Sequence, residues 1–109
     1  MSDVIWVYAE LNENKITATT LEMLTKAAQV GKAEALLLGP APDDAVQSLA
    51  AYGASKIYRA ADPVYAEYLT LPAAATVAQL IQQHQPAVML FASSYAGRDL
   101  ASNLSARLD

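Results

Sequence analysis

The feature that most constrains this chain is the alternation of short apolar runs with segments of helical spacing. Residues 4–9, 35–39 and 87–92 are short runs of apolar residues, the first rich in β-branched and aromatic side chains. Such runs are typical of strands buried on both faces of a parallel sheet. Residues 55–59 alternate polar and apolar side chains, which predicts a strand nearer the sheet edge.

Each of these runs is followed by a segment in which apolar residues recur at helical spacing. Thr17 or Thr20 can cap the first helix, and Gly31 lies where it should stop. Asp43 and Asp44 open the second helix, Pro72 fits the first turn of the third, and residues 98–108 form the last. The order β-α-β-α-β-α-β-α predicts a doubly wound, Rossmann-like parallel sheet within a three-layer α/β/α fold.

The length of 109 residues corresponds to one small domain. The chain stops at Asp109 directly after a predicted helix, although in this architecture a helix normally returns to another strand. The pattern therefore predicts a truncated unit with an exposed sheet edge, and we expect self-association.

The charge pattern excludes several classes of partner. The formal net charge is −4, and the seven Lys and Arg residues are scattered, which argues against binding of nucleic acid. The absence of cysteine excludes disulfides, thiolate catalysis and zinc–cysteine sites. The start has no basic leader, and no apolar run approaches the roughly 20 residues that span a bilayer. We therefore expect a cytoplasmic protein with no membrane insertion.

Ligands of open α/β sheets bind at the carboxyl ends of the strands, so a phosphate cradle would lie in the loops at that edge. The first loop, residues 10–15, has no glycine and carries two glutamates, so a dinucleotide fingerprint is absent there. The second loop, residues 39–42, has two prolines without N–H groups, and Asp43 and Asp44 follow it. Neither loop favours a phosphate.

The third loop, residues 93–99, is the best candidate anion site. Ser93, Ser94, Gly97 and Arg98 combine hydroxyls, a glycine and a guanidinium at the start of a predicted helix, whose dipole favours an anion. The same residues also suit a structural part, in which a serine caps the helix, Gly97 permits close packing and Arg98 forms an ion pair. Both interpretations remain open from the sequence.

No catalytic or metal-binding constellation emerges from the sequence. The only histidine, His84, lies at a polar helix end before Pro86, and no carboxylate or second ligand is close in sequence. It precedes the fourth strand directly, so it belongs to the amino edge of the sheet, away from the strand-end serines that a triad would need. Trp6, within an apolar run, is expected in the core.

The segments, taken in order, resemble the amino-terminal domain of electron transfer flavoprotein alpha subunits. The most specific pieces are the Asp-Pro…Tyr segment at residues 62–69 and the small-residue loop with Gly-Arg-Asp-Leu at residues 92–101, followed by Arg107-Leu108. Ser102 departs from the proline that many members have. Further matching segments are residues 4–10, 15–28, 36–39 and 53–57.

The resemblance implies an adenine nucleotide alpha hydrolase-like fold and an electron carrier rather than an enzyme. Such proteins are alpha–beta heterodimers that carry electrons from flavin dehydrogenases to a quinone oxidoreductase or another acceptor. FAD is held mainly by the carboxyl-terminal domain of the alpha subunit, which is absent from residues 1–109. This chain is then scaffold and subunit contact, with the beta subunit as partner and no cofactor of its own.

Other interpretations stay open beside the role as electron-carrier subunit fragment. In the beta subunit of the resembled family a similar fold binds AMP, so the loop at residues 93–99 can be the vestige of a nucleotide loop. A free-standing nucleotide-binding module of universal-stress type is the alternative, but the glycine-rich loop that such proteins carry before their last strand is missing. A pure interaction domain without a redox role is compatible with the low charged fraction of 17%.

Overall fold

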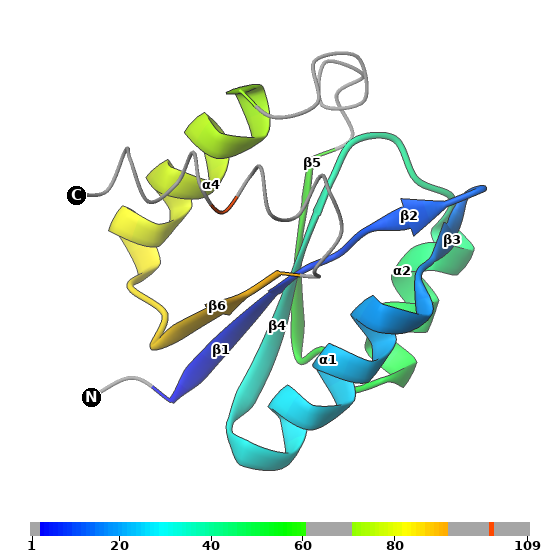
Figure 1. Cartoon of the computed structure of the whole chain (residues 1–109), viewed down its shortest axis with the longest axis horizontal. Coiled ribbons are helices and arrows are strands. Elements are labelled where there is room, and N and C mark those ends of the chain that lie inside the picture. Colours follow the sequence, from blue (N-terminus) through cyan, green and yellow to red (C-terminus); the bar gives the residue numbers. More distant parts are fainter. Residues whose placement is uncertain (1–2, 61–70, 92–100, 102–109) are drawn as a thin grey trace.

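The computed structural model describes residues 3–60, 71–91 and 101 of the chain. Its strands and helices alternate as the sequence predicts, with a small hairpin added after the first strand (Figure 1). In chain order the elements are β1 (Val4–Tyr8), β2 (Leu11–Asn12), β3 (Lys15–Ile16), α1 (Ala18–Val30), β4 (Lys32–Leu38), α2 (Asp43–Ala51), β5 (Lys56–Ala60), α4 (Leu71–His84) and β6 (Val88–Leu90).

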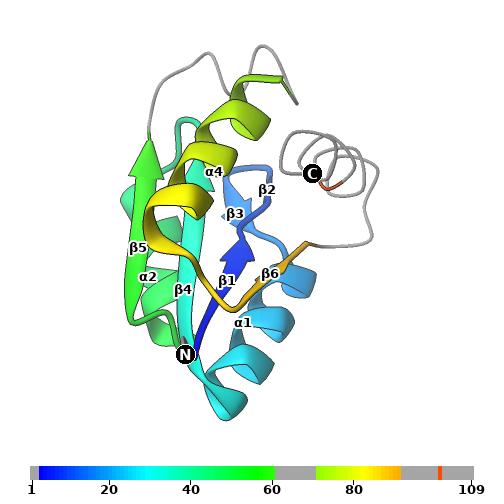
Figure 2. The ribbon, with the colours of Figure 1, turned by 90° about the vertical axis from the view of Figure 1, so that its left-hand side faces the viewer.

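The main sheet has four strands in the order β5-β4-β1-β6, and every neighbouring pair is parallel. Helices α1 and α2 pack on one face and α4 packs on the other, which confirms the doubly wound three-layer α/β/α prediction (Figures 1 and 2). Strand β5 lies at the edge, as its alternating sequence predicts. The strand order itself could not be read from the sequence.

Among the described residues, the face under α1 and α2 holds the larger apolar core. Val7 and Leu37 point to it from the strands, and Leu24 and Leu49 point to it from the helices, all four with 0% exposure. Side chains of successive strand residues alternate between faces, so Trp6 and Leu36 belong to the opposite core under α4. Trp6 is fully buried, as predicted.

Glycines end both helices on the first face, as the sequence indicated. Helix α1 ends at Val30, and a Cβ on Gly31 would lie 2.5 Å from the Asp3 carbonyl oxygen, so only glycine fits. Helix α2 ends at Ala51, and Gly53 follows with φ of 118°, a left-handed conformation that favours glycine.

Several elements differ in part from the sequence prediction. Strand β4 begins at Lys32 rather than at residue 35, because Lys32 lies opposite Val4 in the register with β1. Strand β6 spans Val88–Leu90 and pairs with β1 through three residue pairs, so Ala87 and Phe91 of the predicted strand lie outside it. Residues 11–16 form the β2–β3 hairpin rather than an irregular polar turn.

Several predictions lie outside the described residues. These are the Asp-Pro…Tyr segment at residues 62–69, the loop at residues 93–99 and most of the helix predicted over residues 98–108.

Candidate functional site

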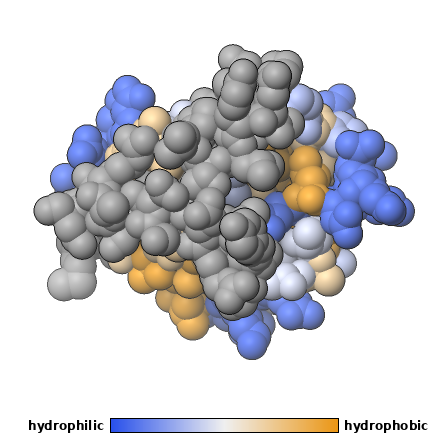
Figure 3. Space-filling view, turned by 45° about the horizontal axis from the view of Figure 1, so that its top comes forward, coloured by the Kyte–Doolittle hydropathy of each residue, from blue (hydrophilic) through white to orange (hydrophobic). Residues whose placement is uncertain are grey.

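Ligands of this architecture usually bind at the carboxyl edge of the sheet. The first connection at that edge, after β1, is the β2–β3 hairpin. Glu13 and Asn14 connect the two strands with φ values of 53° and 65°, the paired positive angles of a type I′ turn. Both residues are exposed. Hydrophilic side chains gather at the end of the molecule where Figure 1 places this hairpin (Figure 3). The hairpin occupies the position at which nucleotide-binding sheets carry a glycine-rich loop.

The amino end of α1 is capped by the chain's own hydroxyls. Thr17 is the N-cap, and its Oγ1 accepts a hydrogen bond of 3.2 Å from the backbone N–H of Thr20. The Thr20 Oγ1 lies 2.8 Å from the Thr17 Oγ1 and accepts from the Glu10 backbone N–H at 3.1 Å. Thr17 is therefore the N-cap of α1, and the Thr20 hydroxyl bonds to it; both residues were candidates from the sequence. The cap thus takes one of the N–H groups that an anion at this helix end would bind.

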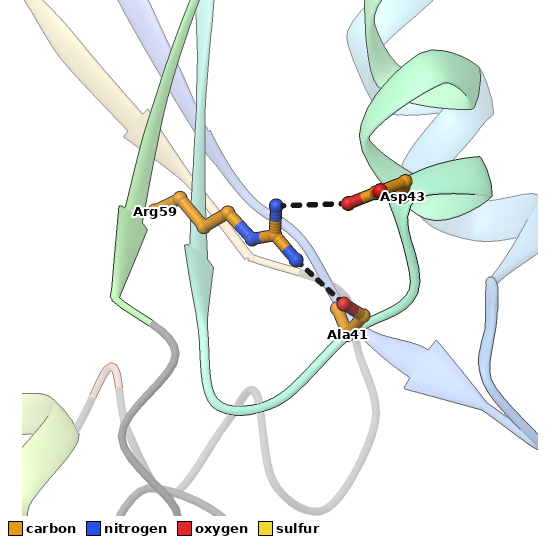
Figure 4. Close-up of polar contacts among 3 residues, drawn as sticks. All are labelled: Ala41, Asp43 and Arg59. Atoms are coloured by element: carbon orange, nitrogen blue, oxygen red, sulfur yellow. Dashed lines mark hydrogen bonds and ion pairs between the residues drawn. The ribbon is translucent and has the colours of Figure 1, made fainter.

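The second loop is held by Arg59, which projects from the carboxyl end of β5 (Figure 4). Its Nη2 donates to the Ala41 carbonyl oxygen at 2.6 Å, and its Nη1 lies 3.4 Å from the Asp43 Oδ1. A hydrogen bond joins β4 to β5 at the point where the loop begins. The Gly39 N–H donates to the Ala60 carbonyl oxygen at 2.7 Å. Arg59 thus links the end of β5 to the start of α2.

The electrostatics of the second loop oppose an anionic ligand. Asp43 and Asp44 occupy the first turn of α2, as predicted, and both are exposed. Pro42, the N-cap, contributes no side-chain hydrogen bond. The guanidinium of Arg59 is already engaged by Asp43 and the loop carbonyl. These charges disfavour a phosphate at this loop.

Ser93, Ser94, Gly97 and Arg98 lie outside the described residues, so their role as an anion loop stays a prediction. Among the described residues, no group of three or more His, Cys, Asp and Glu side chains could hold a metal ion. No helix in that same part of the chain combines the length and the hydropathy needed to cross a membrane.

A buried carboxyl group on the α4 face was missed by sequence reasoning. Glu34, in the middle of β4, is 6% exposed, and its Oε1 accepts from the Trp6 Nε1–H at 3.0 Å. The Tyr58 hydroxyl donates to the same oxygen at 3.4 Å. The signal was present, because a charged residue within a run of alanines and leucines indicates a partnered group. It was overlooked because the strand was expected to begin after Glu34.

His84 joins this cluster through its ring. The imidazole centroid lies 5.2 Å from that of Tyr58 and 6.0 Å from that of Trp6. It stands at the end of α4 and on the amino side of β6, as the sequence predicts. The rings of Trp6 and Tyr58, which His84 contacts, are the same two that bond the Glu34 carboxyl.

Tyr8, at the end of β1, is the described group with the clearest electrostatic perturbation. Burial raises the pKa of its phenol to about 12, with a further contribution from the negative charge of Glu10. Its ring packs against Phe91, with centroids 5.8 Å apart. Tyr8 therefore stays protonated and acts as an aromatic member of the α4 face.

Comparison with known proteins gives the family. The model of the electron transfer flavoprotein domain matches residues 5–109. The chain belongs to this family. It is 34% identical over 104 residues to the electron transfer flavoprotein subunit alpha of Syntrophomonas wolfei, covering 94% of this chain and 33% of that protein. The subunit alpha of Mycobacterium tuberculosis is 33% identical over 110 residues, covering 99% and 34%.

This electron transfer flavoprotein domain spans about a third of the length of the curated relatives that it matches. The resemblance seen in the sequence is thereby confirmed at the level of the family. Among solved structures, protein Rv1636 from Mycobacterium tuberculosis H37Rv aligns with a TM-score of 0.45 at 16% identity, over 96% of this chain and 87% of that one.

Proposed function

We propose that this chain is the scaffold and subunit-contact part of an electron transfer flavoprotein alpha subunit. The observation that carries the proposal is the family match over residues 5–109, together with relatives named subunit alpha. The parent protein is then a heterodimer with a beta subunit in the cytoplasm. It carries electrons from flavin dehydrogenases to a quinone oxidoreductase or another acceptor, and is an electron carrier rather than an enzyme.

The proposal places the FAD of the parent outside residues 1–109. Its support is the chemistry of the two described loops at the carboxyl edge. The Thr17 hydroxyl already accepts from the Thr20 N–H at the start of α1, and Asp43 and Asp44 place negative charge at the start of α2. A flavin dinucleotide carries a pyrophosphate, which prefers free N–H groups and positive charge.

Two binding measurements on the 109-residue chain test this function. We expect a beta subunit to retain the chain on an affinity column, and we expect calorimetry with AMP, ATP and FAD to show no tight binding. Tight binding of AMP or ATP would instead support the nucleotide-binding alternative. In that event Arg98→Gln should abolish the binding if residues 93–99 form the site, whereas the matched Arg107→Gln variant should retain it.

We also propose that the chain self-associates when it stands alone. Val88 in β6 is 45% exposed, and among the described residues no strand pairs with the outer edge of β6. Light scattering across a concentration series should show a mass that rises above that of the monomer. A constant monomer mass at high concentration would refute this proposal.

A further inference from the structure

A groove of about 410 Å³ runs along the outer side of α1. Its lining consists of Tyr52, the C-cap residue of α2, and six residues of α1, which are Ala18, Leu21, Glu22, Thr25, Lys26 and Gln29. The side chain of Tyr52 is 49% exposed. Aromatic side chains are enriched in protein–protein interfaces, so an exposed ring beside a groove favours a docking surface.

The groove has an apolar side and a charged side. Leu21 lies on the side of α2, because it also lines a neighbouring hollow together with Tyr52. Glu22 lies about 100° around the helix from Leu21, and Lys26 follows Glu22 by about one turn. Both charged side chains are exposed, and among the described residues neither takes part in an ion pair. The charged side of the groove therefore carries one charge of each sign in a fixed order along α1.

We propose that this groove docks a second copy of the chain, with the two α1 helices antiparallel about a two-fold axis. The axis passes beside Leu24, midway between Glu22 and Lys26. Glu22 of each copy then faces Lys26 of the other, so two equivalent ion pairs form across a self-complementary contact. A parallel pair of helices would instead place like charges against each other, which is unfavourable. The order of the charges therefore favours the antiparallel pair.

The same two-fold axis brings the apolar side of the groove together. Gly53 lies against the second half of α1, since a Cβ on it would be 2.9 Å from the Ala28 Cβ, and Tyr52 directly precedes it. Ala18 and Leu21 lie in the first half of α1. An antiparallel partner sets each first half beside the other second half, so Tyr52 of each copy covers Ala18 and Leu21 of the other. A contact made mainly by one pair of helices is small, and we expect a weak dimer.

Sedimentation equilibrium of charge variants tests the ion pairs. We expect Lys26→Glu to raise the dissociation constant of the dimer about tenfold, because it replaces two attractive pairs by two repulsive ones. Glu22→Lys should have the same effect. The double variant Glu22→Lys/Lys26→Glu should restore the wild-type constant, because it keeps both pairs with their signs exchanged. A monomeric wild-type chain, single variants that dimerise as well as the wild type, or a double variant that stays weak would each overturn the proposal.

A cysteine placed on α1 separates this contact from association through the outer edge of β6 and from the proposed electron-carrier role. The chain has no cysteine, so one introduced thiol reports on one position. Thr25 is exposed and lies next to the axis, and antiparallel helices about 8–10 Å apart bring such positions within reach of a disulfide. Thr25→Cys should form a disulfide-linked dimer under mild oxidation. The matched control Gln79→Cys, at an exposed position of α4, should stay largely monomeric, and equal crosslinking of the two variants would contradict the α1 contact.

Discussion

The two faces of the sheet reverse the placement of large and small side chains. Under α1 and α2 the strand β4 contributes the small Ala33 and Ala35, and the helices contribute leucines such as Leu24. Under α4 the strands contribute large rings such as Trp6, and the fully buried residues of the helix are the smaller Ala74 and Val77, while Leu80 and Ile81 are partly buried. Helices α1 and α2 therefore pack close to the strand backbone, whereas α4 packs on a layer of rings.

The polar groups of the two faces also differ. On the first face, Thr20 is fully buried, and its hydroxyl lies within bonding distance of Thr17 and of the Glu10 backbone N–H. On the second, the buried polar group is the carboxyl of Glu34, which costs more to remove from water than a hydroxyl. A fold that looks evenly layered is therefore expected to be unevenly stable, with the first face holding the domain together.

The largest effect is expected for Leu24→Ala on the first face. Leu24 is 0% exposed in α1, and truncation of a buried leucine removes about 3 kcal/mol from the free energy of unfolding. Urea denaturation followed by circular dichroism measures this loss. Hydrogen exchange should accelerate over the whole domain, since α1 belongs to its main core. Faster exchange confined to α1 would contradict the view that the first face holds the domain together. The control is Thr25→Ala, at an exposed position of the same helix, which should leave the exchange unchanged.

The second effect appears at alkaline pH on the α4 face. Burial raises the pKa of Tyr8 to about 12, above its ordinary value of 10.0. Below pH 10 both states are protonated, and from pH 10 towards 12 the unfolded state ionises first, so stability falls as pH rises. The loss approaches roughly 2.5 kcal/mol. Tyr8→Phe should remove it in urea titrations, and exposed Tyr52→Phe should not. An unchanged alkaline profile for Tyr8→Phe would refute the assignment.

A smaller and more local effect is expected for Val77→Ala in α4. Val77 is fully buried, and the loss of two methyl groups removes about 1.5 kcal/mol. Hydrogen exchange should speed up in residues 74–84 while α1 keeps its protection. If both helices lose protection equally, the two faces form one cooperative unit and the comparison is wrong. The exposed Ala75→Gly variant separates loss of packing from loss of helix propensity.

The sequence predicted the layers because each strand and helix carries its own periodicity. Three local signals are confirmed. The apolar run at residues 4–9 predicted a strand, the aspartates predicted the start of α2, and Gly31 predicted the end of α1. The hairpin was missed because Glu13 and Asn14 adopt positive φ without the glycine that usually marks such a turn. Rules for two-residue turns look for a glycine, so they did not predict a turn at Glu13 and Asn14.

The polar clusters depend on contacts between residues far apart in the chain. Glu34 meets Trp6 across 28 residues and Tyr58 across 24, and these meetings follow from the strand order. His84 was correctly placed at the end of a helix, but its ring contacts required the knowledge that α4 covers that face. Sequence reasoning therefore located the elements and missed the cluster that distinguishes the two faces.

The smallest expected effect is a gain of stability at the exit of α4. Gln85 adopts a φ of 50°, and its N–H donates to the Ile81 carbonyl oxygen at 2.8 Å, in a helix-ending turn that normally uses glycine. Gln85→Gly removes the strain but increases the entropy of the unfolded chain, for a net gain of about 0.5 kcal/mol. Thermal unfolding should then shift upwards by roughly 2–4 °C. Gln83→Gly, inside the same helix, should lower the midpoint instead, and a fall for both variants would show that the left-handed exit is not strained.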